Sequence, residues 1–185
     1  LGRDSVYLDP ARIPLIPLER VDVVVLPATL RVYLVTRRQA STAPVTEVGI
    51  TTGQFSTAGY RGAFLKRWRS GMGLSLVADW SDISGPAATA TTPFHDVDLW
   101  LKAEYVPSGK VGISYQRLSS DWKRSGNAAP VVDPVHSKRV DQLLRLFLAA
   151  RADGFGPRLD ITLAKTAVTR DTVVGNRSLS QANLE

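Results

Sequence analysis

The side chains best suited to chemistry in this chain are carboxylates, and several of them lie in one segment. Asp96, Asp98 and Glu104 all fall on one parity of the stretch 95–106. Paired carboxylates could act as the acid and base of a glycosidase, or could hold a cation. Lys102 lies between them on the same parity, however, and such a row of charges is more simply the wet side of a β-strand.

No other catalytic or metal-binding pattern stands out. The serines lack a Gly-x-Ser-x-Gly elbow, and His95 beside Asp96 is a pair of sequence neighbours, not a triad. There is no cysteine, and the two histidines, His95 and His136, are distant from each other. Gly154-Phe155-Gly156 fits a hairpin turn better than a phosphate-binding loop. We therefore expect no enzyme activity, no metal and no cofactor.

Length and composition fit one ordinary folded domain without a membrane-spanning helix. The chain has 185 residues, 44% of them hydrophobic, and no apolar run is long enough for such a helix. The net charge is +6, but basic and acidic residues are interspersed along the chain. A solvated surface explains this pattern better than a nucleic-acid site does, so we expect no nucleic-acid partner.

The elements that must position the charges are β-strands, because polar and apolar residues alternate between Val48 and Val168. In 71–82, for example, Met72, Leu74 and Leu76 share one parity while Ser75 and Asp79 share the other. The alternation predicts about seven strands, at 46–55, 60–69, 71–82, 95–106, 110–118, 138–151 and 158–168. The segment 138–151 is also the best candidate for a helix, although a period of two fits it as well.

Two kinds of all-β protein have strands with one apolar and one polar face: a soluble sandwich and a transmembrane β-barrel. Tight turns near 70–71, 107–109 and 152–154 alternate with long connections at 81–94 and 119–137, as in outer-membrane barrels. Aromatic residues lie near both strand ends, as interfacial girdles require. These features favour part of an antiparallel barrel meander whose wet face lines a lumen, with these lumen-facing candidates: Arg61, Arg67, Asp96, Asp98, Lys102, Glu104, Arg145 and Asp160. The alternative is a soluble all-β binding or structural domain with no membrane role.

Composition divides the chain into a Pro-rich region at 1–40, the strand region at 45–170, and a tail or the start of a further loop at 171–185. Residues 16–28 read IPLERVDVVVLPA and residues 30–38 read LRVYLVTRR. Together they suggest two apolar strands joined by the small turn Pro27-Ala28. A polar linker and the first strand of the barrel pattern then follow in order.

This order resembles the end of the plug domain of TonB-dependent outer-membrane receptors, with Pro27-Ala28 in place of that family's usual Gly-Pro-like turn. The resemblance covers about forty residues closely and the barrel region only by pattern. It implies a receptor in the bacterial outer membrane for uptake of a nutrient such as a metal chelate or an oligosaccharide. It also implies contact with outer-membrane lipid and with a periplasmic energy-transducing protein through an N-terminal segment missing here. Because a bacterial barrel needs at least eight strands, we expect the remaining ones to come from the same or another chain.

Overall fold

The computed structural model describes residues 17–37, 39–54, 56–84, 93–125, 127–128, 131–132, 134–149, 158–172 and 175–184. Every regular element among these residues is a β-strand and every strand pairing is antiparallel, so the expected all-β class is confirmed. The chain forms two compact units, Leu1–Arg38 and Gln39–Glu185.

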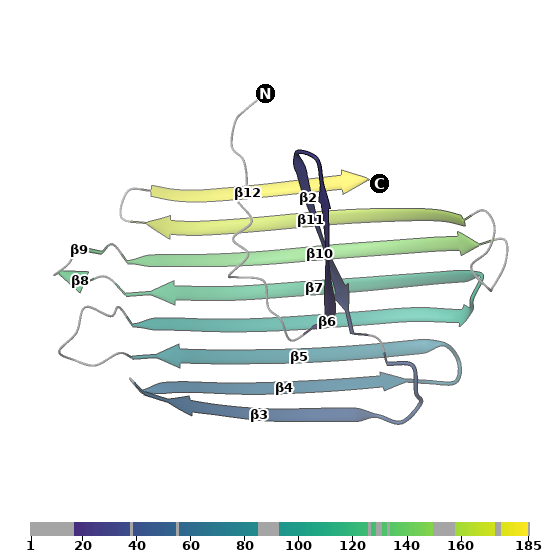
Figure 1. Cartoon of the computed structure of the whole chain (residues 1–185), viewed down its shortest axis with the longest axis horizontal. Coiled ribbons are helices and arrows are strands. Elements are labelled where there is room, and N and C mark those ends of the chain that lie inside the picture. The colour runs from purple at the N-terminus through teal and green to yellow at the C-terminus, as the bar shows by residue number, and fades with distance from the viewer. Residues whose placement is uncertain are drawn as a thin grey trace. The chain divides into compact units, whose positions relative to one another are not determined.

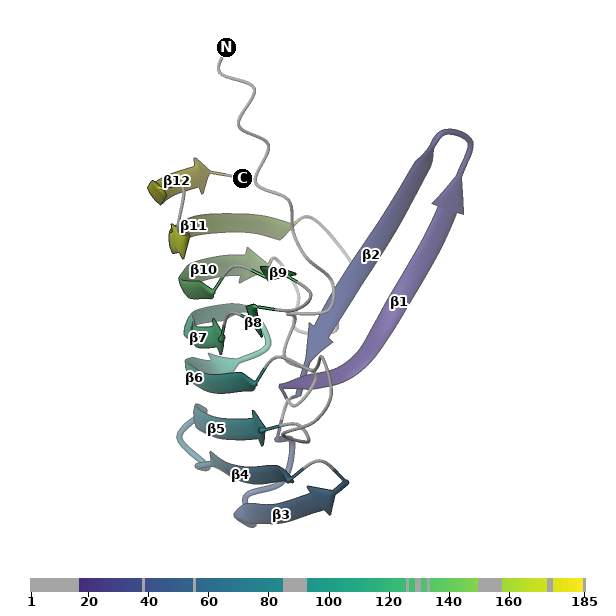
Figure 2. The ribbon, with the colours of Figure 1, turned by 90° about the vertical axis from the view of Figure 1, so that its left-hand side faces the viewer.

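The first unit contains a β-hairpin of β1 (Leu18–Leu26) and β2 (Thr29–Thr36), shown in Figure 2. Both strands are rich in β-branched residues, which suit extended backbone. Pro27 fixes the first turn position, and Ala28 then adopts a φ of +66°. At the open end of the hairpin, the backbone N–H of Arg37 donates to the carbonyl oxygen of Pro17 at 2.7 Å.

Replacing Ala28 by glycine should stabilise the hairpin. The left-handed conformation places an alanine Cβ close to the following carbonyl, at a cost of about 1 kcal/mol that glycine does not have. We expect slower amide hydrogen exchange across β1 and β2 in Ala28→Gly. The control, Ala103→Gly, removes a Cβ from an interior strand position and should be destabilising by roughly 0.5–1 kcal/mol. Faster exchange in Ala28→Gly would contradict the turn geometry.

The second unit is an eight-stranded meander, in the order β12-β11-β10-β7-β6-β5-β4-β3 (Figure 1). Its strands are β3 (Val45–Gly53), β4 (Thr57–Arg67), β5 (Met72–Ile83), β6 (Phe94–Ser108), β7 (Val111–Arg124), β10 (Val135–Ala149), β11 (Arg158–Thr172) and β12 (Gly175–Leu184). A small hairpin of β8 (Asn127–Ala128) and β9 (Val131–Val132) follows β7 and precedes β10 along the chain. Among the described residues the sheet is not closed, because β3 and β12 each pair with one neighbour.

The structure contains all seven expected strands, and the described part of the segment 138–151 belongs to a strand, β10, which ends at Ala149. The expectation for 171–185 is wrong, because this segment holds the end of β11 and the whole of β12 instead of a tail or loop. Its sequence is polar at both parities, so no apolar period marks the strand. For the same reason β7 continues to Arg124, six residues beyond the expected end at Leu118.

The alternation of tight and long connections holds only in the middle of the meander. Short connections at 68–71 and 109–110 lie at one end of the strands, and long ones at 84–93 and 125–134 lie at the other. We call the first of these ends the tight-turn end and the second the long-loop end. Residues 54–56 and 173–174 are also short connections, although they lie at the long-loop end. The expected turn at 152–154 lies outside the described residues.

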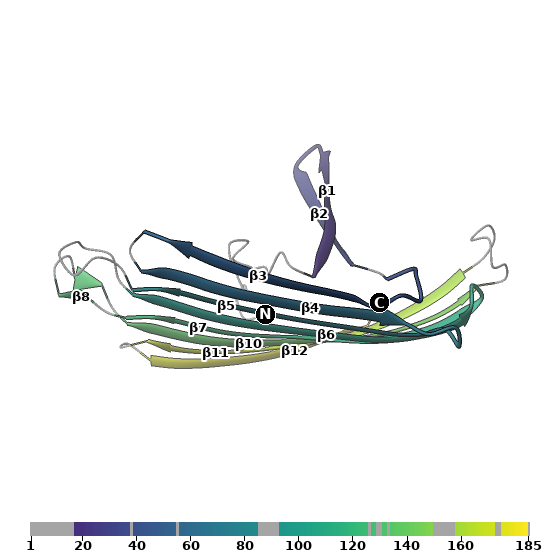
Figure 3. The same cartoon turned by 90° about the horizontal axis from the view of Figure 1, so that it is seen from below.

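The strand register assigns every side chain of the sheet to one of two faces, because directly paired residues share a face. A cross-strand row is a set of residues that are paired directly from one strand to the next. One such row includes Ala63, Val77, Trp100 and Asp141, and we call the side of the sheet on which it lies the charged face. The opposite side, which includes the row of Phe64, Leu76 and Leu101, is the apolar face. Figure 3 shows that the strands are bent along their length, so the sheet has a concave and a convex side.

Burial divides sharply between the two faces. Among the side chains whose burial the structure describes, the buried ones of the sheet lie on the charged face: Ala63, Leu65, Ser75, Val77, Trp100, Val135, Ser137 and Ala149. Among the side chains whose exposure the structure describes, the exposed large hydrophobic residues of the strands lie on the apolar face: Val48, Ile50, Tyr60, Met72, Leu76, Leu99, Tyr105, Val111, Ile113, Leu144, Leu146, Leu148, Leu159, Ile161 and Leu163. The described residues of the second unit therefore leave one broad apolar surface that the unit itself does not cover.

Candidate functional site

The structure places all eight lumen-facing candidates on the charged face, from Arg61 in β4 to Asp160 in β11. The eight residues therefore share one face of the sheet, as their sequence parity predicted. Parity did not show which of them are in contact, because cross-strand pairing also depends on register.

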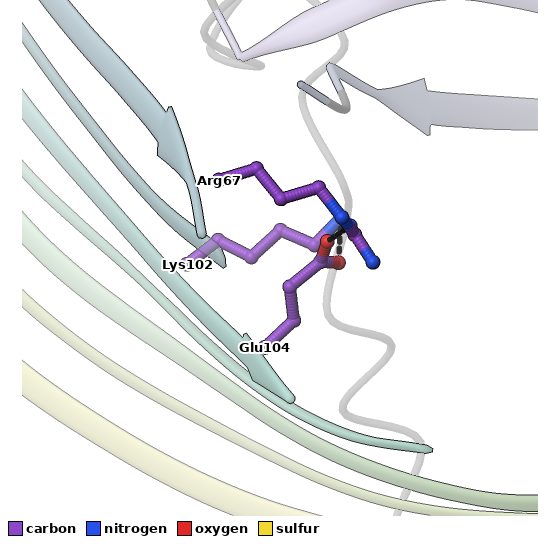
Figure 4. Close-up of polar contacts among 3 residues, drawn as sticks. All are labelled: Arg67, Lys102 and Glu104. Atoms are coloured by element: carbon purple, nitrogen blue, oxygen red, sulfur yellow. Dashed lines mark hydrogen bonds and ion pairs between the residues drawn. The ribbon is translucent and has the colours of Figure 1, made fainter. Parts of the chain in front are cut away.

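The tightest charge cluster joins Arg67, Lys102 and Glu104 at the tight-turn end of β4 and β6. Arg67 Nη1 donates to Glu104 Oε1 at 2.6 Å, and Lys102 Nζ lies 3.8 Å from Glu104 Oε2. These side chains are only 12–15% exposed. Figure 4 shows them projecting together from the concave side of the sheet. One carboxylate therefore pairs with two cations in a partly desolvated place.

A glycine makes room for this cluster. Gly73 is the cross-strand partner of both Arg67 and Glu104. A Cβ at Gly73 would lie 2.7 Å from Glu104 Cγ, so the glutamate side chain lies directly over the bare backbone. A glycine within a strand often marks such a close approach.

Other charge pairs on the same face are more exposed. Arg145 donates from Nε and Nη2 to Asp160 Oδ1 at 3.0 and 2.8 Å. Arg61 Nη2 lies 3.8 Å from Asp79 Oδ2. The pair Arg139–Asp141, at 2.7 Å, was not among the candidates, although its parity on β10 matches that of Arg145. Adjacent charges of both signs thus extend across the face from β4 to β11.

Asp96 and Asp98, which suggested a carboxylate pair, both lie on the charged face of β6. Asp98 is the cross-strand partner of Asp79, and one buried side-chain oxygen of Asp98 accepts no hydrogen bond from the described residues. Among the described residues, no group of three or more His, Cys, Asp or Glu side chains is placed to hold a metal ion.

The apolar face carries a band that runs obliquely across the strands. On β3 the centre of the band is Val48, which lies in the same cross-strand row as Ala78 of β5. On β11 the centre is Ile161, which lies in the same cross-strand row as Met72 of β5. The centre therefore shifts by six residues over six steps between neighbouring strands. With a rise of about 3.3 Å per residue and about 4.8 Å between strands, the band is inclined by roughly 35° to the perpendicular of the strands.

This band ends abruptly on three neighbouring strands. Proceeding toward the long-loop end, the apolar face changes from Tyr115 to Arg117 in β7 and from Leu163 to Lys165 in β11. In β10, between them, Leu144 is followed by Gln142, whose Nε2 donates to the Tyr115 hydroxyl at 3.3 Å. Apolar surface thus gives way to polar or basic surface within a single step of the strand.

Aromatic side chains lie at both limits of the band, as the alternation predicted. Tyr60 and Trp80 stack at the long-loop end of β4 and β5, with ring centroids 5.2 Å apart. Trp68 and Tyr105 lie at the tight-turn end and are 41% and 46% exposed. Aromatic rings of this kind suit a boundary between apolar and polar surroundings.

The apolar face contains a depression of about 600 Å³ that the sequence analysis did not predict. Its centre lies at Gly62 and Ala78, which are paired across β4 and β5. Larger side chains surround these two residues, and a Cβ added at Gly62 would meet nothing within 4 Å. The signal in the sequence is two small residues at positions where the apolar parity otherwise carries large ones. Its apolar-face lining comprises Thr46, Val48, Gly62, Phe64, Leu76, Ala78, Leu99, Leu101, Arg117 and Ser119.

Comparison of the chain with protein-family models, with curated proteins and with solved structures finds no match. The likeness to TonB-dependent receptors therefore rests on the sequence of the hairpin region and its position ahead of the strands. The described residues contain no helix with the length and hydropathy needed to cross a membrane.

Proposed function

We propose that the eight-stranded sheet is part of the wall of an outer-membrane β-barrel whose apolar face contacts lipid and whose charged face borders an aqueous lumen. The observation that carries this proposal is the uncovered apolar band. Monomers in water seldom expose a contiguous apolar patch larger than a few hundred Å².

The inclination of the band supports the membrane setting over a second covering sheet. Strands in transmembrane barrels tilt by about 35–45° from the membrane normal. A band inclined by roughly 35° to the perpendicular of its strands becomes parallel to the membrane plane at that tilt. Polar residues beyond Tyr115 and Leu163 would then lie at the level of the headgroups.

The charged face supports the assignment of a wet lumen. Its ion pairs leave both signs of charge next to one another, which polar solutes can approach without meeting a single-sign field. Combined with the plug-like hairpin sequence, this favours a receptor that takes up a nutrient such as a metal chelate or an oligosaccharide. The hairpin region would gate the lumen, and an energy-transducing periplasmic protein would act on it.

Site-directed labelling tests this proposal directly, because the chain contains no cysteine of its own. Ile113→Cys places a fluorophore on the apolar face, and Ser114→Cys places the same label on the charged face of the same strand. After refolding into phosphatidylcholine vesicles, a nitroxide attached to the lipid tails should quench the label at 113, and a water-soluble quencher should reach the label at 114.

The contrary result would be water access at both positions together with a monodisperse chain in buffer without detergent. That outcome would replace the membrane wall by a soluble all-β domain.

A further inference from the structure

The depression in the apolar face is lined by apolar side chains over most of its extent and by polar side chains at one side. Gly62 and Ala78 form its floor, and the apolar side chains around it come from four strands: Val48, Phe64, Leu76, Leu99 and Leu101. Arg117 and Ser119, on β7, lie at one side. A ligand that fits must be apolar over most of its length and polar at one end.

Arg117 supplies a positive charge that no described residue matches with an ion pair. Its side chain is exposed and has no ion-pair partner among the described residues. On the apolar face of β7 the nearest carboxylate is Asp121, which contacts His136 at 2.8 Å and Lys138 at 3.3 Å. Lys165 lies in the same cross-strand row as Arg117, with only Gln142 between them. An anionic group beside Arg117 would therefore meet cations and no competing acid in that row.

We propose that this depression binds one phospholipid with a net negative headgroup, with an acyl chain over Gly62 and Ala78 and the phosphate against Arg117. Guanidinium groups recognise phosphate by paired charge-assisted hydrogen bonds. This inference rests on the proposed contact between the apolar face and a membrane.

The dimensions and the inclination of the band agree with this orientation. Arg117 and Phe64 belong to one cross-strand row and are three strands apart, which corresponds to roughly 14 Å. Arg117 lies just beyond the apolar band in β7, whereas Phe64 lies in its interior in β4. A lipid placed along this row has its headgroup at the polar boundary and its tail in the middle of the band.

The test compares lipid retention by four forms of the full chain: wild type, Gly62→Val, Arg117→Gln and Lys123→Gln. Gly62→Val fills the depression at a position with free space, and Lys123→Gln is the control that removes another exposed cation from the apolar face of β7. Each protein is refolded into phosphatidylcholine vesicles that contain one-tenth phosphatidylglycerol, extracted in mild detergent, and analysed for bound lipid by mass spectrometry.

We expect wild type and Lys123→Gln to retain about one phosphatidylglycerol per chain, enriched about tenfold over the vesicle composition. Arg117→Gln should lose this enrichment, and Gly62→Val should lose retention of either lipid. If all four forms insert and retain lipids in the proportions of the vesicle, the specific site is overturned while the membrane wall stands.

A second arm separates failure of the site from failure of insertion. If the chain does not insert, the four forms are titrated in buffer with dihexanoyl-phosphatidylglycerol below its micelle concentration. Saturable binding that is lost in both Gly62→Val and Arg117→Gln would support the site without the membrane wall. Absence of binding in wild type, or equal binding in all forms, would overturn it.

Discussion

Replacing Leu76 by arginine is expected to destabilise the membrane-inserted sheet by about 2–4 kcal/mol, which is the cost of a lipid-facing cation near the bilayer midplane. Leu76 is the central residue of the apolar run Met72–Trp80 in β5, and it is 42% exposed. In water an exposed position of this kind tolerates most changes to within about 0.5 kcal/mol. The free energy of urea unfolding should therefore change strongly in vesicles and little in buffer.

Two neighbouring residues of β3 allow the two faces of the sheet to be compared at nearly the same depth in the membrane. Val48 is 79% exposed on the apolar face, and its neighbour Glu47 is exposed on the charged face. Val48→Arg should behave like Leu76→Arg, whereas Glu47→Arg should cost less than about 1 kcal/mol. Ser75 is not a suitable control, because it is only 6% exposed and a long side chain there would be overpacked. Equal tolerance at positions 47 and 48 in vesicles would refute the lipid contact.

The second large effect is expected from Glu104→Ala, which should lower the free energy of unfolding by about 3 kcal/mol. The substitution removes the carboxylate that pairs with both Arg67 and Lys102, two side chains that are 15% and 14% exposed. Little water can reach these cations, so their repulsion is poorly screened. Chemical denaturation of the folded chain, combined with the double-mutant cycle of Arg67→Ala and Glu104→Ala, would measure the coupling.

The control for this cluster is the pair Arg145–Asp160 on the same face. Its side chains are 47% and 35% exposed, so Asp160→Ala should cost less than about 1 kcal/mol. A similar loss in Asp160→Ala and Glu104→Ala would mean that the partial burial of Glu104 has no energetic weight.

The sequence pattern predicted the strands wherever one parity is apolar. The segment 138–151 shows how this works, because Leu144, Leu146 and Leu148 fit a strand and the structure places them in β10. Pattern reading failed where both parities are polar, at the end of β7 and throughout β12. There the strand is specified by its pairing with a neighbour, which a local period does not show.

For the candidate site, parity identified the charged face, because a strand alternates its side chains strictly. It did not identify the contact of Glu104 with Arg67, which depends on the register of β4, β5 and β6 and on the space over Gly73. Nor did it reveal the depression, since Gly62 and Ala78 become adjacent only when β4 and β5 pair.

The oblique apolar band also sets the thickness of the membrane that the protein would suit. The apolar run of β5 from Met72 to Trp80 covers eight residue steps, or roughly 26 Å of strand. A tilt of roughly 35° reduces this to roughly 21 Å along the membrane normal, which is less than the hydrocarbon core of about 30 Å in a typical bilayer. A wall with this hydrophobic height would match thin bilayers best, and thicker ones would have to compress around it.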